Sequence, residues 1–207
     1  MHLLFSKDKP EIDAIAVTVG PGLIGSLLVG VETAKSLFYI WNKPIIPVNH
    51  LLGHIYANFV SQKSNIKTPK FPDIGLIVSG GHTDLVLIKK HGKIEWIGGT
   101  KDDAAGEALD KTGRLLGLPY PAGPKIEELA KKGIDSFHFP RPLINDPTYD
   151  FSFSGLKTAV LREIQKLSEE EKKTKINDLC ASVQQAVIDV LVSKLLKAAK
   201  ENNVKSI

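Results

Sequence analysis

The sequence predicts an α/β protein, and two observations support that prediction. Short runs of β-branched and apolar residues alternate with longer segments in which apolar residues recur at helical spacing. Residues 12–19 (IDAIAVTV) are the clearest strand run, and residues 23–41 are the clearest helical segment. Turns rich in glycine and proline, such as Gly20-Pro21-Gly22, separate the two kinds of segment. A chain of 207 residues is long enough to bury a sizeable core.

The other expected elements follow from the same signals, taken in chain order. Asn49 is a preferred N-cap residue, so a helix is expected from there to about Phe59. Strands are expected at residues 44–48, 74–78, 84–90 and 93–98, with a further strand starting at Val204. Helices are expected at residues 102–116, 155–167 and 172–202, with a short one that ends at Lys132. Residues 61–73 and 133–150 are expected to be irregular.

The composition is that of an ordinary globular protein. The chain is 43% hydrophobic and 24% charged, and its formal net charge is +4. This mild positive bias is compatible with an RNA partner but does not require one. Residues 1–8 lack the pattern of a signal peptide, and the apolar stretch at residues 23–41 is interrupted by charges, so we expect no membrane span. A cytoplasmic or organelle-matrix protein is therefore expected.

The sequence contains a single cysteine, Cys180. One cysteine excludes an internal disulfide and cannot form a thiolate metal cluster. Because Cys180 lies within a helical pattern, we expect it to belong to the core and not to act as a nucleophile.

Two histidines four residues apart form the sharpest local signal for chemistry. His50 and His54, in the sequence NHLLGH, would lie on one face of a helix with both rings able to reach one ion. Two unrelated surface histidines are the competing interpretation, but a position directly after a strand favours a ligand site. The metalloprotease form of this spacing needs a glutamate where the chain has Leu51, which disfavours peptide hydrolysis.

A turn of small residues between two expected strands is the second signal. In Ser79-Gly80-Gly81-His82, glycines would let backbone N–H groups approach an anion without interference from a Cβ atom. A plain β-hairpin with a glycine turn explains the pattern equally well. The segment is neither a Walker loop nor a Rossmann fingerprint.

Carboxylates in the segment that begins at Asp102 form the third signal. Asp102 and Asp103 would stand at the start of a helix, where capping and the helix dipole account for them. Glu107 and Asp110 are i, i+3 neighbours among small residues, where a helix can pass close to a ligand. A carboxylate there could accept hydrogen bonds from ribose hydroxyls.

Two further segments complete the candidates. Residues 120–124 (YPAGP) form a loop whose glycine suits close approach of a ligand or helix. Ser154 is expected to cap the helix that follows, and Lys157 would lie in its first turn. A lysine opposes the helix dipole there, which favours anion binding, although a solvated lysine is the alternative.

Taken together, these segments resemble the TsaD family, once described as glycoprotease-like, in its bacterial and organellar branch. The matching segments, in order, are VTVGPGLIGSLLVGVETAKSL, PVNHLLGHIYA, IVSGGHTDLVLI, DDAAGEALDKTGRLLGLPYPAGP and DFSFSGLKTAV. The resemblance implies an actin-like/Hsp70-like ATPase (ASKHA) fold, incomplete here, with residues 1–207 as its central part. Residues 1–60 would end the first subdomain, 61–203 would form the second, and 204–207 would start a truncated strand.

The resemblance also implies an activity, which is that of a tRNA N6-adenosine threonylcarbamoyltransferase. Such an acyltransferase moves a threonylcarbamoyl group from threonylcarbamoyl-AMP to the exocyclic amine of the adenosine 3′ of the anticodon, in tRNAs reading codons that begin with A. The implied cofactor is one divalent metal ion, iron or zinc, and the implied nucleotide is that adenylate or ATP. The implied partners are tRNA, a paralogous actin-like subunit of the TsaB type, a small ATPase of the TsaE type, and a second copy in a homodimer.

The family's functional residues carry over by position onto this chain. His50 and His54 correspond to two metal ligands, and no protein nucleophile is implied. Asp110 and Gly123 match ligand-binding positions, and Glu127 falls where many members have an aspartate in the nucleotide site. The adenylate-binding segment corresponds to Ile77, Val78, Ser79, Gly80 and Gly81.

Departures from the family pattern leave a second interpretation open. Ala122 replaces a usual glycine, and Gly113 replaces a commoner alanine. The family's N-terminal Glu-Thr-Ser-Cys-Asp-Asp motif is not in this sequence, nor are its later glycine-rich turn, nucleotide-binding asparagine and third metal ligand, an aspartate. A metal site with two protein ligands is open and weak. The alternative to the enzyme is therefore a catalytically inactive truncated paralogue that acts as a binding or dimerisation module.

Overall fold

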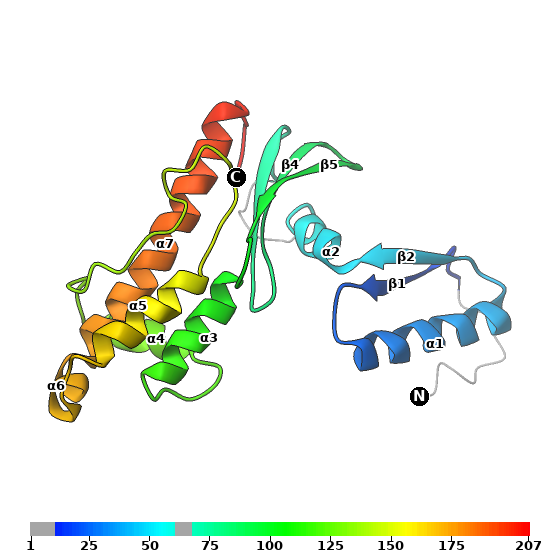
Figure 1. Ribbon diagram of the computed structural model, residues 1–207. Coiled ribbons are helices and arrows are strands. Elements are labelled where there is room, and N and C mark those ends of the chain that lie inside the picture. The colour runs from blue at the N-terminus through cyan, green and yellow to red at the C-terminus, as the bar shows by residue number, and fades with distance from the viewer. Residues whose placement is uncertain (1–10, 61–67) are drawn as a thin grey trace. The chain divides into compact units, whose positions relative to one another are not determined.

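The computed structural model describes residues 11–60 and 68–207, and the chain divides into two compact units. The first unit is Met1–Thr68 and the second is Pro69–Ile207. The division falls within the loop expected at residues 61–73, of which residues 61–67 lie outside the described part. Both units mix helices and strands, so the expected α/β class is confirmed (Figure 1).

The first unit is a strand–helix–strand–helix segment. Its elements are β1 (Ile15–Gly20), α1 (Ile24–Trp41), β2 (Ile45–Asn49) and α2 (His50–Ala57). Strands β1 and β2 pair in parallel, with α1 as the crossover between them. The Asn49 side chain accepts hydrogen bonds from the backbone N–H groups of Leu51 (2.9 Å) and Leu52 (3.3 Å). This capping confirms the expected start of α2 directly at the end of a strand.

The second unit is built on an antiparallel sheet in the order β3-β4-β5. Its strands are β3 (Asp73–Val78), β4 (Thr83–Lys90) and β5 (Lys93–Gly99). Beside β3, the chain after the last helix forms a parallel bridge between Ser206 and Asp73. The backbone N–H of Lys205 donates to the Pro72 carbonyl at 2.8 Å, so the extended segment expected after Val204 is present.

Five helices described in the second unit lie on one side of this sheet (Figure 1). They are α3 (Ala105–Leu115), α4 (Gly123–Ala130), α5 (Ser154–Ile164), α6 (Glu169–Thr174) and α7 (Ile176–Glu201). The buried core contains residues of the sheet, of α3, α4, α5 and α7 and of the irregular segment before α5, including Ile74, Leu85, Phe151, Val160 and Val183. Burial of this apolar surface, at roughly 25 cal/mol per Å², is the main force that holds the helices on the sheet.

Three boundary predictions are wrong, each for a local reason. The expected helix at 172–202 is two helices, because Ser168 and Glu171 form a capping box that starts α6 and the chain turns at Lys175 before α7. Helix α3 begins at Ala105 and not at Asp102. Ser154 is the first residue of α5 and not its N-cap, which is Phe153.

Asp102 explains two of these differences, because its carboxylate serves the start of α5. It accepts hydrogen bonds from the backbone N–H groups of Phe153 (2.8 Å) and Ser154 (3.1 Å), and from the hydroxyls of Ser152 (2.5 Å) and Ser154 (2.8 Å). A residue about 50 positions earlier in the sequence therefore supplies the cap that Ser154 was expected to provide. Asp102 itself stays outside α3.

We expect Asp102→Asn to lower the free energy of unfolding by about 1 kcal/mol, which is typical of a lost helix cap at an exposed position. Burial alone would raise the pKa of Asp102, but hydrogen bonds from Ser152, Phe153 and Ser154 outweigh it and hold the pKa below its usual 3.8. A carboxylate whose pKa is lower in the folded than in the unfolded state stabilises the fold above about pH 4. That stabilisation is lost as the pH falls through the folded-state pKa.

Urea unfolding of wild type and Asp102→Asn at neutral and acidic pH measures this contribution. The difference between the two proteins should shrink as the pH falls below 3.8. Glu170→Gln, an exposed carboxylate in α6, is the control and should change little at any pH. A difference for Asp102→Asn that is equal at both pH values would contradict the assignment.

Helix α7 corrects the expectation that no segment could span a membrane. With 26 residues and a mean hydropathy of 1.5 over its most apolar window, it is long and apolar enough by length and composition. Part of its apolar surface, including Leu179, Val183 and Val190, is buried in the core, and 44% of that window is buried, whereas Ile188, Val192 and Leu196 are exposed. The ammonium of Lys194, also buried, donates to the carbonyls of Asp146 (2.9 Å) and Thr148 (2.7 Å). α7 thus packs as the central helix of its unit.

Cys180 is fully buried on α7, as expected for a core residue. Burial raises the pKa of its thiol to about 11, so the thiol is neutral near pH 7. Because the thiolate is the nucleophilic form, a role for Cys180 as a nucleophile is disfavoured.

Candidate functional site

The two histidines of the first unit lie side by side on the first two turns of α2. The Nε2 atoms of His50 and His54 are 3.1 Å apart, and their ring centroids are separated by 4.4 Å with a T-shaped arrangement. Both residues are exposed. The Asn49 cap fixes the start of the helix, so the i, i+4 spacing brings both rings to one face as expected.

This separation suits shared coordination of one metal ion. A metal–nitrogen bond of 2.0–2.1 Å places two ligand nitrogens about 2.9 Å apart at a right angle and about 3.4 Å apart at the tetrahedral angle. The observed 3.1 Å lies between these limits. Among residues 11–60 and 68–207, no cluster of three or more histidine, cysteine, aspartate or glutamate side chains could hold a metal ion. The described part of the chain therefore offers two ligands of a site that needs more.

We expect His50→Ala and His54→Ala each to reduce Zn²⁺ or Fe²⁺ binding at least tenfold, since a single imidazole retains little affinity. Isothermal titration with each metal measures the loss, and circular dichroism checks that α2 is intact. His91→Ala, a histidine of the second unit, is the matched control and should bind as wild type does. Unchanged metal binding in both α2 variants would contradict the assignment.

In the second unit, the Ser79-Gly80-Gly81-His82 turn joins β3 to β4 and is closed by its own serine. The Ser79 hydroxyl accepts from the backbone N–H groups of Gly81 (3.3 Å) and His82 (3.0 Å), and the Ser79 N–H donates to the His82 carbonyl (2.9 Å). The turn is a hairpin connection, which was one of the two alternatives for this sequence, and anion binding at the turn stays a prediction. An entering anion would compete with one weak hydroxyl acceptor.

Helix α3 begins against this turn. The Gly106 N–H donates to the Ser79 carbonyl at 3.2 Å, and the hydroxyl of Thr83 accepts from the Ala105 N–H at 2.9 Å. A Cβ atom at Gly106 would lie 2.7 Å from the Ser79 carbonyl oxygen, which explains why glycine stands here. Thr83, which the sequence analysis did not select, therefore ties the start of α3 to the glycine turn.

A pocket of about 510 Å³ opens between this turn and helices α3, α4 and α7. Its lining residues are Val78, Ser79, Ala105, Gly106, Leu109, Gly123, Glu127, Gln184, Val187, Ile188 and Leu191. Four of the expected adenylate-site residues are among them, namely Val78, Ser79, Gly123 and Glu127. The volume falls in the range typical of small-molecule sites.

The other expected residues lie around this pocket without lining it. Ile77 precedes the lining strand end, and Gly80 and Gly81 complete the turn. Asp110 on α3 accepts a hydrogen bond from the Ala122 N–H at 2.7 Å, which places the loop just before Gly123. Asp110 thus positions the start of α4 in this structure.

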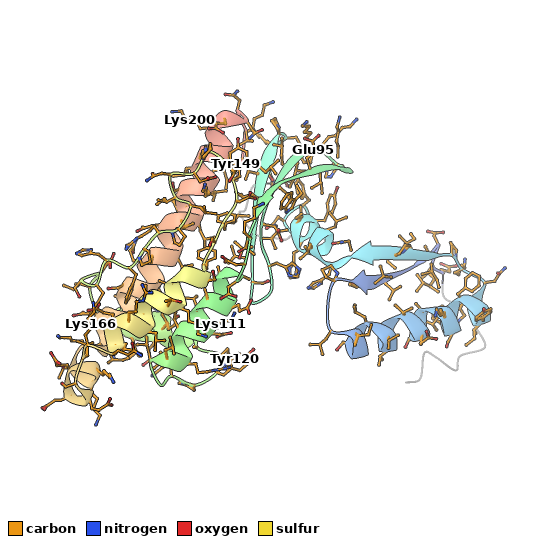
Figure 2. The ribbon with its side chains drawn as sticks, in the orientation of Figure 1. Glu95, Lys111, Tyr120, Tyr149, Lys166 and Lys200 are labelled. Carbon is orange, nitrogen blue, oxygen red and sulfur yellow. The ribbon has the colours of Figure 1, made fainter. Side chains whose placement is uncertain are left out.

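The charged side chains near the pocket are paired with lysines. Glu127 lies 2.8 Å from the Lys131 ammonium, whose hydrogen bond and charge lower the pKa of Glu127. Lys111, labelled in Figure 2, contacts Asp103 at 2.5 Å and Glu107 at 3.0 Å. A carboxylate on Glu127 is therefore ionised at neutral pH and can accept hydrogen bonds from a ligand. The side chain of Lys157 is exposed on α5 and is not part of the pocket lining.

The α7 side of the pocket was missed by the sequence analysis. The α7 residues Gln184, Val187, Ile188 and Leu191 are spaced i, i+3, i+4 and i+7, so they form one stripe. Helical periodicity can indicate which face of α7 is apolar. What the pattern did not show is that part of this face borders a pocket and is not filled by the core.

Comparison with known proteins identifies the family. The TsaD family, described as tRNA N6-adenosine threonylcarbamoyltransferase, matches residues 6–207. The chain belongs to the TsaD family. It is 51% identical over 197 residues to the tRNA N6-adenosine threonylcarbamoyltransferase of Bacillus subtilis, which covers 95% of this chain and 56% of that protein. The enzyme of the same name from Staphylococcus epidermidis is 50% identical over 203 residues, or 98% of this chain and 58% of that protein.

The chain thus spans a little over half the length of these TsaD relatives. The matched part includes the histidine pair, the glycine turn and every residue that lines the pocket. The resemblance stated from the sequence is therefore confirmed, and the candidate site lies entirely within the region shared with the family.

The two departures from the usual TsaD residues meet in the structure. A Cβ atom at Gly113 on α3 would lie 2.2 Å from the Cβ of Ala122, which precedes α4. Loss of a methyl group at position 113 thus makes room for one at position 122. We therefore expect the two departures to compensate each other where α3 packs against the start of α4.

Proposed function

We propose that this protein carries out threonylcarbamoyl transfer from threonylcarbamoyl-AMP to the exocyclic amine of the adenosine 3′ of the anticodon, in tRNAs reading codons that begin with A. The observation that carries this proposal is the 51% identity over 95% of the chain to a relative named for that activity. The pocket supports it, because four residues expected to contact the adenylate line one cavity of suitable size.

The residues of the second unit would bind and orient the adenylate. The phosphate would lie at the Ser79-Gly80-Gly81 turn, where backbone N–H groups face it. The Glu127 carboxylate and the Gly123 backbone would contact the ribose, and Asp110 would hold the loop before Gly123 in place. These contacts would leave the threonylcarbamoyl carbonyl open to the attacking amine.

The transfer itself needs no protein nucleophile. The tRNA amine attacks the carbonyl carbon, the bond from that carbon to the phosphate oxygen breaks, and AMP leaves as the amine loses a proton. We propose that His50 and His54 hold one divalent metal ion, iron or zinc, which would polarise the carbonyl as a Lewis acid. Additional ligands would complete that ion's coordination.

The fold, partners and location proposed for this activity are those implied by the resemblance to the TsaD family. We propose that the two units belong to the two subdomains of an actin-like/Hsp70-like fold, with residues 1–60 in the first, 61–203 in the second and 204–207 at the start of a further strand. The proposed partners are tRNA, a TsaB-type paralogous subunit, a TsaE-type small ATPase and a second copy of the chain. The proposed location is the cytoplasm, away from the membrane.

A transfer assay tests the function. The chain would be assayed alone and fused to the flanking segments of the Bacillus subtilis relative, with labelled threonylcarbamoyl-AMP, an unmodified tRNA and the two partner proteins. We expect label on the tRNA with the fused protein and its loss in the His50→Ala, His54→Ala double variant. If the fused protein transfers no label to the tRNA, the proposed transferase activity is refuted.

The same assay distinguishes the alternative of an inactive binding module. Exposed apolar side chains on α1, including Ile24, Val29 and Tyr39, and at its N-cap Leu23 favour association with another protein surface. If the fused protein forms a dimer or binds a partner yet transfers no label, the binding module is the correct function. Measurable transfer would exclude it.

A further inference from the structure

The amide of Gln184 has no partner in the part of the chain that the structure describes. It belongs to α7 and is half-buried in the pocket wall, and no hydrogen bond joins it to any described residue. Its neighbour Gln185, in contrast, points away from the pocket lining and donates to Asp189 at 2.6 Å. An amide has two donors and one acceptor, so a half-buried one without partners offers binding capacity to a ligand.

The residues around Gln184 indicate which kind of ligand its amide could bind. The other α7 residues in the wall, Val187, Ile188 and Leu191, are aliphatic. On the facing side, Ala105 and Leu109 of α3 are also apolar. A mostly apolar pocket with a single amide suits a heteroaromatic ring, whose faces contact aliphatic groups while its edge forms hydrogen bonds.

The order of the elements places Gln184 relative to the glycine turn. The end of α7 lies at the start of β3, because Lys205 hydrogen bonds to Pro72 and the following segment runs parallel to β3. α7 therefore runs antiparallel to β3. Six strand residues span about 20 Å, which equals about 13 helical residues at 1.5 Å each. The end of β3 is thus level with about Ile188.

Ser79 follows the end of β3 by one residue of about 3.3 Å, so it is level with about Ala186, and Gln184 lies about 3 Å further along α7 at 1.5 Å per residue. Helix α4 also borders the pocket. Its C-terminal end is near the start of α7, since the Ile134 N–H donates to Asp178 at 2.9 Å, and its residues Gly123 and Glu127 line the cavity. The pocket lining therefore combines the Ser79 end of the glycine turn, the Glu127 carboxylate and the Gln184 amide.

We propose that Gln184 is a specificity-determining residue that recognises adenine. Its Oε1 would accept from the N6 amine and its Nε2 would donate to N7, the two-point contact that glutamine makes with adenine. The proposal rests on the proposed function, because it assumes that an adenylate occupies this pocket. It adds a reason why the site would select adenine over other purines.

Binding of AMP, IMP and 7-deaza-AMP to the 207-residue chain tests this assignment. IMP lacks the N6 donor and 7-deaza-AMP lacks the N7 acceptor, so wild type should bind each on the order of tenfold more weakly than AMP, as expected for one two-point contact. In Gln184→Leu, AMP affinity should fall to the level of the two analogues. Gln184→Glu keeps an acceptor for the N6 amine but has no donor for N7, so it should bind AMP and 7-deaza-AMP equally and still disfavour IMP.

Gln185→Leu is the matched control and should keep the wild-type preference. Thermal unfolding of each variant verifies that the fold is retained. The role of Gln184 is refuted, while the transferase stands, if Gln184→Leu keeps the wild-type ratio of AMP to IMP affinity or if Gln184→Glu keeps the wild-type ratio of AMP to 7-deaza-AMP affinity. It is also refuted if wild type binds all three ligands equally. If wild type binds no AMP at all, the assignment of this pocket as an adenylate site is refuted. The transfer assay then tests the proposed function separately.

Discussion

Gly113→Ala should lower the free energy of unfolding by about 1–3 kcal/mol, the usual cost of overpacking a core. The new Cβ atom would lie 2.2 Å from the Cβ of Ala122. Both atoms are attached directly to backbone, so no rotamer change can separate them. Adding Ala122→Gly removes the contact and should restore most of the stability, because alanine also has the higher helix propensity at position 113.

A double-mutant cycle by urea unfolding measures the coupling between these two positions. Gly155→Ala is a suitable control, since a Cβ atom there would meet nothing within 4 Å. That variant should be as stable as wild type or slightly more stable. If the effects of Gly113→Ala and Ala122→Gly add within about 0.5 kcal/mol, the two positions are independent and the compensation is wrong.

Lys194→Ala should destabilise the second unit by roughly 2–4 kcal/mol. The change leaves a cavity where a fully buried side chain stood, and it leaves the Thr148 carbonyl without its lysine donor and the Asp146 carbonyl with the Lys197 ammonium alone, at 3.2 Å. The loop that these carbonyls belong to leads into Phe151 and the start of α5. Loss of Lys194 should therefore loosen that segment as well as α7.

Lys194→Met separates the two contributions, because methionine keeps most of the apolar stem and removes the ammonium. We expect it to recover part of the loss, measured by the urea midpoint at constant slope. Lys200→Ala, an exposed lysine on the same helix (Figure 2), should change the midpoint little. A Lys194→Met variant as stable as wild type would show that the two carbonyl hydrogen bonds contribute nothing net.

Local sequence signals predicted the elements well where the chain itself marks their ends. Gly20-Pro21-Gly22 ends β1, and Asn49 starts α2 within its own segment, so both boundaries were found within a residue or two. The start of α3 was missed because Asp102, a good cap in sequence, is hydrogen-bonded to the start of α5. No local pattern can report a partner that lies 50 residues away.

The candidate site also has features that the local sequence predicts and features that depend on tertiary packing. The histidine spacing and the glycine turn are local features, and the structure shows both as expected. The α7 side of the pocket is a tertiary feature, because Gln184 borders a cavity only through the packing of α4 beside α7. Periodicity shows which side chains face inward, but it cannot show where the interior is left open to a ligand.

Burial is distributed very unevenly between the two units. Among the described residues of the first unit, Ala34 and Ile55 alone are buried, whereas the core cluster lies in the second. Opening free energy rises with the apolar surface that is protected. Amide hydrogens of α1 and α2 should therefore exchange with solvent long before those of α7, and in this chain the histidine pair should lose its geometry at lower denaturant than the pocket.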